Sequence, residues 1–518
     1  MLEGNRLYMG LDENGERVYL PLSMCSRHGL IAGATGTGKT ITMKIMAEDF
    51  SEAGVPVFLC DVKGDVSGIC QKGDQSDNME ERIDRFGIRD EFEYKPFFAT
   101  FWDLYGQGGH PIRATVSDMG PELLSRILGL TEVQEGVLNI IFKIADDNNL
   151  LLIDLKDLKS MINYVGEHKD EYTLEYGNIA TQSLGAITRA LIPIENQGGD
   201  VFFGEPMMDI MDWIRVDANG KGMINILDAT SLIHTPKVYA IFLLWMIAEL
   251  YEVLPEVGDL EKPRMVFFFD EAHLLFNDAP KVLIEKIEQM VKLIRSKGVG
   301  VFFVTQNPGD IPNGVLAQLN NKVQHALRAY TPSELKAVKA AVNSFRENPA
   351  FDSEEVIKEL GTGEALVSFL GEDGIPSIAH RTKIICPQSK MAQCDPAIKA
   401  AMRAQDGMSK YDLAVDRQSA YEDISAQLIQ EEQERLQQEA LVAQIKEDEK
   451  RQKELAKQAE KEAKERERAK NSVIGSALGT VGREVGKTVG GKFGSFGKKV
   501  GGNAGASLAR NLFKMLKK

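Results

Sequence analysis

An eight-residue stretch near the start of the chain, GATGTGKT, has the residue types and spacing of a loop that binds the phosphates of a nucleotide. It consists of Gly33, Ala34, Thr35, Gly36, Thr37, Gly38, Lys39 and Thr40. Glycines let backbone N–H groups turn inward around phosphate oxygens, and a following helix adds the positive end of its dipole. Lys39 would reach the β- and γ-phosphates, and Thr40 would bind Mg²⁺. The stretch therefore predicts a site for ATP with Mg²⁺.

Two carboxylates end an apolar segment farther along the chain, MVFFFDEAHLLF at 265–276. Asp270 would hold the Mg²⁺ through water, and Glu271 would polarise the attacking water as a general base. A second apolar segment, 299–308, ends in Gln306, which would contact the γ-phosphate or its water. The alternative for each is a polar residue that only ends a strand. His273 is predicted to pack rather than to catalyse.

Other charged residues are candidates with a less specific signal. Asp61 and Lys63 follow an apolar segment, at the edge of a sheet where ligands bind in open α/β folds, and the alternative is a polar turn. Arg295 and Arg328 are candidates for an arginine that one subunit inserts into the ATP site of its neighbour. Such an arginine neutralises charge in the transition state. The alternative for both is an arginine on the surface or in an ion pair.

Strand and helix patterns alternate from about residue 28 to 385, as these motifs require. The strand patterns are 28–32, 55–60, 222–227, 265–269 and 299–305, and a helix pattern runs from 40 to about 52. Continuous apolar runs are typical of a parallel sheet buried on both faces. We therefore predict an α/β fold with a mainly parallel sheet and crossover helices. The longest apolar run, 238–250, is too short to span a bilayer and is predicted to be a buried helix.

The composition changes along the chain and suggests three parts. Residues 1–385 would form the ATPase domain, in which about 66–220 contain a mostly helical insertion. Residues 386–470 read as a charged helical extension with many opposite-charge pairs, whose apolar positions are irregular for a coiled coil. Residues 471–518 form a basic, glycine-rich tail with a net charge of +8. The net charge of the whole chain, −15, argues against a simple nucleic-acid-coating protein. Subtracting the charge of the tail leaves −23 for the first 470 residues, so an acidic body carries a basic tail.

The tail carries nine apolar residues that are each followed by glycine and recur at steps of three or four. This period predicts an amphipathic helix that orders on an anionic membrane or against a partner helix. The alternative is a disordered basic tail. Five cysteines without a CxxC pair, and a start without a signal-peptide pattern, predict a reduced cytoplasmic setting, with the membrane periphery as a further possibility through the tail.

Five segments together resemble the HerA/FtsK class of P-loop ATPases, and most closely the bacterial HerA-like ATPases. They are RHGLIAGATGTGKT, DVKGD, FFFDEAHLLF, RSKGVGVFFVTQNPGDIP and HALRAYTP, and the resemblance covers roughly residues 5–390. It implies a RecA-like core, a hexameric ring with ATP bound between subunits, and often double-stranded DNA in the pore. Only about 30 residues precede the P-loop, too few for the N-terminal β-barrel of HerA. Patterns of the membrane anchor and winged-helix domain of FtsK are not found.

Two functions of different classes follow from these observations. The first is ATP hydrolysis that drives a hexameric ring motor, a HerA-like DNA translocase or helicase. The second is an ATP-regulated assembly or scaffold protein that acts on protein or membrane partners, which the acidic body and basic tail favour. An unrelated enzyme such as a kinase is the remaining alternative.

Overall fold

The protein is described here by a computed structural model that covers residues 1–276, 279–328 and 331–470. The chain divides into two compact units, Met1–Leu428 and Ile429–Lys518. Residues 386–428, which the sequence places at the start of the charged extension, thus belong to the first unit. The tail at 471–518 lies outside the described residues, and its predicted helix stays a prediction.

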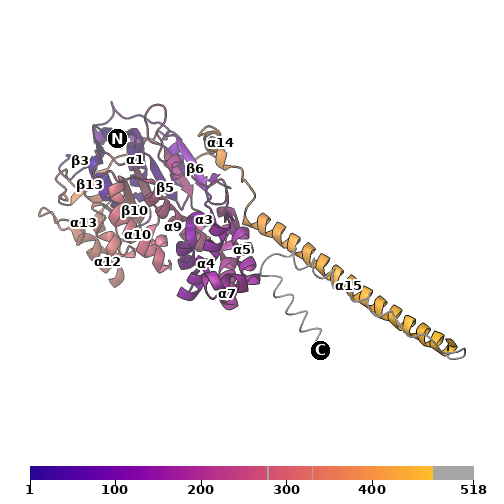
Figure 1. Ribbon diagram of the computed structural model, residues 1–518. Helices are drawn as coiled ribbons and strands as arrows, with labels where there is room; N and C mark the ends of the chain where they lie inside the picture. The colour runs from indigo at the N-terminus through magenta and orange to yellow at the C-terminus, as the bar shows by residue number, and fades with distance from the viewer. Residues whose placement is uncertain (277–278, 329–330, 471–518) are drawn as a thin grey trace. The chain divides into compact units, whose positions relative to one another are not determined.

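The described strands of the first unit form one 13-stranded sheet (Figure 1). Its order is β1-β2-β13-β12-β11-β4-β10-β9-β5-β8-β6-β7, with β3 paired to β2. The strands are β1 (Leu2–Glu3), β2 (Arg6–Leu11), β3 (Arg17–Pro21), β4 (Gly29–Ala32), β5 (Val57–Asp61), β6 (Ala99–Asp103), β7 (His110–Pro111), β8 (Ile224–Asp228), β9 (Met265–Phe269), β10 (Val299–Thr305), β11 (Asn321–His325), β12 (Glu364–Ser368) and β13 (His380–Ile384).

The sheet has a parallel half and an antiparallel half that meet at β11. From β11 to β7 all neighbouring strands are parallel. On the other side of β11, the strands β12, β13, β2, β1 and β3 pair in antiparallel fashion. The predicted α/β fold with a mainly parallel sheet is confirmed, and the antiparallel extension is a feature that the sequence patterns did not predict.

Helices cover both faces of the sheet. They are α1 (Lys39–Glu52), α2 (Asp77–Phe86), α3 (Val116–Leu128), α4 (Glu132–Asp147), α5 (Leu155–Glu167), α6 (Lys169–Tyr176), α7 (Thr181–Glu195), α8 (Gly199–Phe202), α9 (Pro236–Val253), α10 (Lys281–Leu293), α11 (Asn313–Leu316), α12 (Pro332–Val342), α13 (Ser353–Glu359), α14 (Pro396–Arg403) and α15 (Ala420–Lys470). Successive side chains of a strand point to opposite faces. In β9, Val266 and Phe268 therefore belong to the apolar cluster that includes residues of α1 and α2, whereas Phe267 and Phe269 belong to the cluster that includes residues of α9 and α3–α5.

The segment 66–220 contains the helices α2–α8 and also the strands β6 and β7, which join the edge of the sheet. Three of its helices begin at capping boxes, in which the side chains of the first and fourth residues bind each other's backbone N–H. These residues are Thr115 and Asp118 in α3, Thr131 and Gln134 in α4, and Asp154 and Asp157 in α5. Local sequence thus fixes where these helices begin.

The predicted buried helix at 238–250 lies within α9, which is buried on nearly all sides. A helix that is apolar all round needs either a core or a membrane around it, and here the protein core surrounds it. Among the described residues, no helix has both the length and the apolar character needed to cross a bilayer. In the second unit, all side chains of α15 from 429 to 465 are exposed.

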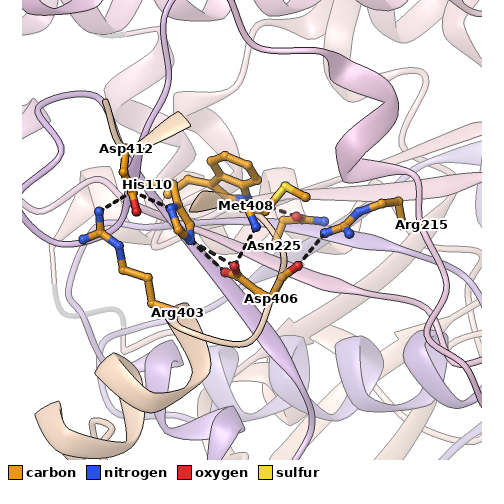
Figure 2. Close-up of polar contacts among 8 residues, drawn as sticks. His110, Arg215, Asn225, Arg403, Asp406, Met408 and Asp412 are labelled. Atoms are coloured by element: carbon orange, nitrogen blue, oxygen red, sulfur yellow. Dashed lines mark hydrogen bonds and ion pairs between the residues drawn. The ribbon is translucent and has the colours of Figure 1, made fainter. Parts of the chain in front are cut away.

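A buried histidine fastens the segment after α14 to the edge of the sheet (Figure 2). His110 lies on β7 with no exposed surface, and its Nε2 is 2.9 Å from Asp406 Oδ2 while its Nδ1 is 2.7 Å from Asp412 Oδ1. Arg403 at the end of α14 binds the same Asp412 oxygen at 2.6 Å. We call these four residues the His110 clasp. The clasp adds charged contacts to the attachment of residues 403–412, in which Met408 and Tyr411 also pack into the apolar core.

Candidate active site

The predicted phosphate-binding loop connects β4 to α1, at the carboxyl edge of the parallel strands. Its backbone needs glycine for two different reasons. A Cβ on Gly33 would lie 2.5 Å from the Cβ of His325, and Gly38 has a φ of +119°. The loop is anchored on both sides, because Gly33 N–H donates to Thr305 O on β10 and Ala34 N–H donates to Ala326 O after β11. The first N–H groups of α1, which have no partner within a helix, thus face the space where phosphates bind.

Lys39 lies inside the curve of this loop and is 6% exposed. Its Nζ donates to Gly33 O at 2.7 Å and to Ala34 O at 3.1 Å. Burial lowers the pKa of Lys39, and the negative charges of Glu271 and Asp270 oppose that effect. The ammonium group and the two carboxylates therefore lie close enough to act on one another electrostatically, as a shared nucleotide site requires.

Asp270 follows β9 and is 3% exposed. Its Oδ2 is buried and has no hydrogen-bond partner in the described part of the chain. Burial and, to a smaller extent, the neighbouring charge of Glu271 raise the pKa of Asp270 to about 7. A buried oxygen without a partner is costly, and a divalent cation would remove that cost. The site therefore fits the predicted Mg²⁺, which Asp270 and Thr40 would hold.

Glu271 is the centre of a group of polar contacts beside the loop. It has a left-handed backbone, with φ 48° and ψ 48°. Lys63 forms an ion pair with its carboxylate, and Gln306 Nε2 donates to both carboxylate oxygens at 3.3 and 3.1 Å. Burial alone would raise the pKa of Glu271, but Lys63 and Gln306 outweigh it, and the pKa is lowered. The carboxylate is therefore ionised at neutral pH and can accept a proton.

The sheet edge brings Lys63 and Gln306 to the same carboxylate although they are far apart in sequence. Asp61 instead shapes the turn before Lys63, because its carboxylate accepts the N–H groups of Gly64 at 2.7 Å and Val66 at 3.1 Å. His273 Nδ1 lies 3.2 Å from Glu271 Oε2, so this histidine is a direct neighbour of the site.

The two candidate arginines lie at opposite ends of the parallel strands. Arg295 precedes β10, at the amino end of the parallel strands, and donates three hydrogen bonds of 3.1, 2.7 and 2.9 Å to Asp259. Arg328 follows β11, at the same edge as the P-loop, and donates to Lys358 O at 2.6 Å and Leu360 O at 3.3 Å. Within the described ranges neither guanidinium bonds to the P-loop or to Glu271. A role for either one in a neighbouring subunit stays a prediction.

Sequence reasoning missed His325, which lies directly under the P-loop with no exposed surface. Burial lowers its pKa to about 4, so the ring is neutral. Its Nδ1 lies 2.9 Å from Glu364 O and must donate, which leaves Nε2 to accept from the Thr42 hydroxyl at 2.9 Å. His325 thus ties α1, β11 and β12 together beneath the phosphate site. His325 begins the segment HALRAYTP, which carries part of the family resemblance, but the resemblance assigned it no role.

Comparison with known proteins identifies the family. The family model described as Helicase HerA-like C-terminal matches residues 7–500. The chain belongs to this family. The site described above makes this HerA-like chain a P-loop ATPase that uses ATP and Mg²⁺.

The HerA-like chain is similar to several named helicases. It is 23% identical over 349 residues to a probable helicase of Methanocaldococcus jannaschii. This match covers 66% of this chain and 60% of that protein. A second probable helicase of that organism is 33% identical over 125 residues, or 23% of this chain and 22% of that protein. The chain thus matches less than two thirds of either protein. The DNA double-strand break repair helicase HerA of Sulfurisphaera tokodaii is 23% identical over 394 residues, 73% of this chain and 69% of that protein.

Solved structures show the same fold. The plasmid coupling protein TrwB in complex with the ATP analogue ADPNP aligns with a TM-score of 0.51 at 14% identity, covering 77% of the HerA-like chain and 92% of TrwB. TrwB with ADP and Mg²⁺ aligns over the same shares with a TM-score of 0.50 at 14% identity. The likeness supports the predicted RecA-like core.

Proposed function

We propose that ATP hydrolysis by this chain drives a ring motor, assembled as a hexamer, that translocates along or unwinds double-stranded DNA. The observation that carries the proposal is the position of Glu271, an ionised carboxylate next to the P-loop lysine, in a chain of the HerA-like family. A protein that binds ATP without hydrolysing it would not need a buried carboxylate that both Lys63 and Gln306 hold in place.

In the proposed reaction, each of these residues acts on a different part of the nucleotide. The P-loop N–H groups and Lys39 hold the β- and γ-phosphates, while Asp270 and Thr40 hold Mg²⁺. Glu271 takes a proton from the attacking water. Gln306 donates to Glu271 and directly follows β10, at the edge of the sheet where the phosphates bind. It would therefore contact the γ-phosphate or its water and respond to hydrolysis. An arginine of the neighbouring subunit, Arg328 or Arg295, would neutralise the charge that develops.

DNA as the substrate is supported by two arguments. The relatives include proteins named DNA double-strand break repair helicase HerA, and the resemblance to the HerA/FtsK class implies a ring with a central pore. An acidic exterior does not exclude this role, since a pore can be basic while the net charge of the chain is −15. We place such a motor in the cytoplasm.

The decisive test is the ATPase rate of the full chain with and without double-stranded DNA, at low and at physiological salt. DNA held through phosphates releases counterions, so stimulation should fall steeply between about 50 and 200 mM salt. The Lys39→Ala variant is the control for contaminating ATPases. A rate that DNA leaves unchanged at every salt concentration would contradict the motor on DNA.

A second function, ATP-regulated assembly on a protein or membrane partner, is favoured by a different observation. The side chains of α15 from 429 to 465 are all exposed, and they lead to a tail with a net charge of +8. An exposed helix of this length provides a surface for another protein, and a basic tail is attracted to anionic lipid, which would bring the chain to the membrane periphery. Stimulation of the ATPase by anionic vesicles, with no effect of DNA, would favour this function.

A further inference from the structure

Three side chains with metal-binding atoms meet in the antiparallel half of the sheet. Asp12 and Glu13 directly follow β2, in the turn that leads to β3, and His380 begins β13. Since β2 and β13 are antiparallel neighbours, the end of the first strand lies beside the start of the second. His380 Nδ1 is 3.7 Å from Asp12 Oδ2 and 4.0 Å from Glu13 Oε1, and one ligand atom of each residue lies within 4.8 Å of the other two. We call these three residues the hairpin triad.

Two of these atoms have no hydrogen-bond partner among the described residues. His380 Nδ1 is buried without one. The side chain of Asp12 is 5% exposed, and both of its hydrogen bonds, from the N–H groups of Asn14 and Glu16 at 2.8 Å, go to Oδ1. Oδ2 receives no hydrogen bond from the described part of the chain, because 3.7 Å is too long for one from His380. Buried polar atoms without a partner are costly, so this pair of atoms indicates a ligand between them.

The third residue of the triad is held in position from behind. Glu13 Oε2 accepts the backbone N–H of Arg381 at 3.1 Å, and Glu13 Oε1 accepts Asn348 Nδ2 at 3.3 Å. Asn348 is 4% exposed, and its Nδ2 also donates to Ala379 O at 2.9 Å. Each carboxylate oxygen has about two lone pairs, so Oε1 can bind a cation while it accepts from the amide. Outer partners of this kind orient the ligands of metal sites.

Charge and ligand type favour a divalent transition metal ion. Among the described residues, neither Asp12 nor Glu13 forms an ion pair with a lysine or an arginine. Mg²⁺ and Ca²⁺ take oxygen ligands, whereas Zn²⁺ takes imidazole nitrogen and carboxylate oxygen together. At metal–ligand distances of about 2.1 Å, two ligands of a tetrahedral Zn²⁺ are about 3.4 Å apart. A small rotation of the side chains brings the observed 3.7 and 4.0 Å to this value.

We infer that the hairpin triad binds a divalent transition metal ion, with Zn²⁺ as the ion that its ligand types fit. The ligands are Asp12 Oδ2, Glu13 Oε1 and His380 Nδ1, and water takes the fourth position. The ion has a structural role, because it links the turn after β2 to the start of β13, about 370 residues later in the chain. This inference does not depend on the proposed motor function.

The first experiment measures binding of Zn²⁺ to the full chain by calorimetry, after treatment with a chelator and in excess Mg²⁺. Asp12→Asn keeps an oxygen for the two N–H groups of the turn and places an amide nitrogen at the ligand position. His380→Phe keeps a ring and removes its nitrogens. The matched control is Glu16→Gln, which removes one negative charge from an exposed side chain of the same turn outside the triad.

We expect Asp12→Asn and His380→Phe to bind Zn²⁺ at least about tenfold more weakly than the original chain, since the loss of an outer partner of a ligand already costs that much. Glu16→Gln should bind Zn²⁺ like the original chain. Equal affinity in all four chains would place the metal elsewhere and overturn the inference. It is also overturned if the original chain binds no Zn²⁺ under these conditions.

A second measurement uses the original chain alone and so does not depend on how the variants fold. Hydrogen exchange of backbone amides should slow on addition of Zn²⁺ in peptides from residues 11–17 and 378–384, because the ion joins these two segments. Mg²⁺ alone should leave both segments unchanged. If Zn²⁺ binds but exchange in both segments stays the same, the hairpin triad is not the site.

Discussion

Replacing His110 with glutamine tests whether the His110 clasp is a charged contact. Both ring nitrogens face carboxylate oxygens, which only accept hydrogen bonds, so both nitrogens must carry protons (Figure 2). Burial lowers the pKa of His110, but Asp406 and Asp412 outweigh this effect, and the pKa is raised. Glutamine retains hydrogen-bonding groups and removes the positive charge.

The size of the effect depends on how well water can replace the lost charge. Asp406 has no exposed side-chain surface, whereas Asp412 is 33% exposed. Removing one partner of a buried ion pair costs about 3–5 kcal/mol, and a solvated pair is worth about 1 kcal/mol or less. We therefore expect His110→Gln to weaken the attachment of residues 403–412 by roughly 3 kcal/mol, the lower end of the buried range. The Asp412→Asn variant should cost about 1 kcal/mol or less.

The effect must depend on pH in one direction. The pKa of His110 is higher in the folded chain than its unfolded value near 6.5. Its contribution to stability is therefore complete below pH 6.5 and is lost as the pH rises through the folded value. The difference between the original chain and His110→Gln should be largest at pH 6 and should shrink at higher pH.

Hydrogen exchange of backbone amides, read by mass spectrometry, measures this contact locally. Peptides that contain residues 403–412 should exchange faster in His110→Gln at pH 6, after correction for the intrinsic pH dependence of exchange, while peptides from α1 should not change. His234→Gln, at an exposed position, is the control. Equal protection in the two chains at pH 6, or a difference that grows with pH, would refute the charged clasp.

Three further predictions concern the site and the tail. Glu271→Gln should bind ATP but hydrolyse it at least about a hundredfold more slowly in a steady-state assay, whereas Lys39→Ala should weaken ATP binding itself, and near-normal turnover by Glu271→Gln would refute the assignment. If Arg328 or Arg295 acts in a neighbouring subunit, its alanine variant should be inactive alone and regain some hydrolysis when mixed with Lys39→Ala chains. This prediction is wrong if light scattering shows that the original chain stays monomeric with ATP and yet hydrolyses it normally. A peptide of residues 471–518 should become helical by circular dichroism with anionic vesicles only. A peptide unstructured with both kinds of vesicle, together with unchanged assembly and membrane sedimentation after removal of the tail, rules that out.

The sequence patterns predicted the central strands because those strands are apolar throughout. The strand β11 escaped prediction although it is also buried, since its residues NKVQH are mostly polar. Their polar groups are satisfied inside the protein: Asn321 Nδ2 donates to Met24 O and His28 O, and His325 bonds to Thr42. A buried strand with such long-range partners cannot be told from a surface loop by its hydrophobic pattern.

The candidate site was predicted where function depends on neighbours in sequence. The P-loop and Asp270 with Glu271 are local motifs, so their spacing is visible in the chain. Lys63 was predicted only to lie at the edge of the sheet where ligands bind, with a polar turn as the alternative. Its partner was not predicted, because the ion pair with Glu271 joins the segments that follow β5 and β9. The His110 clasp was missed for the same reason.

The pairing of β2 with β13 has a consequence for how the chain is made. Leu11 pairs with Lys383, about 370 residues later, and Gly10 lies so close to Lys383 that a Cβ there would be 2.0 Å from its carbonyl oxygen. At about 5–20 residues per second, the ribosome needs roughly 20 to 75 s to add those residues. During that time the first hairpin of the nascent chain has an edge without its final partner, and such edges invite wrong pairing with other chains. The antiparallel side of the sheet therefore closes only after β13 has been translated, last of all the described strands.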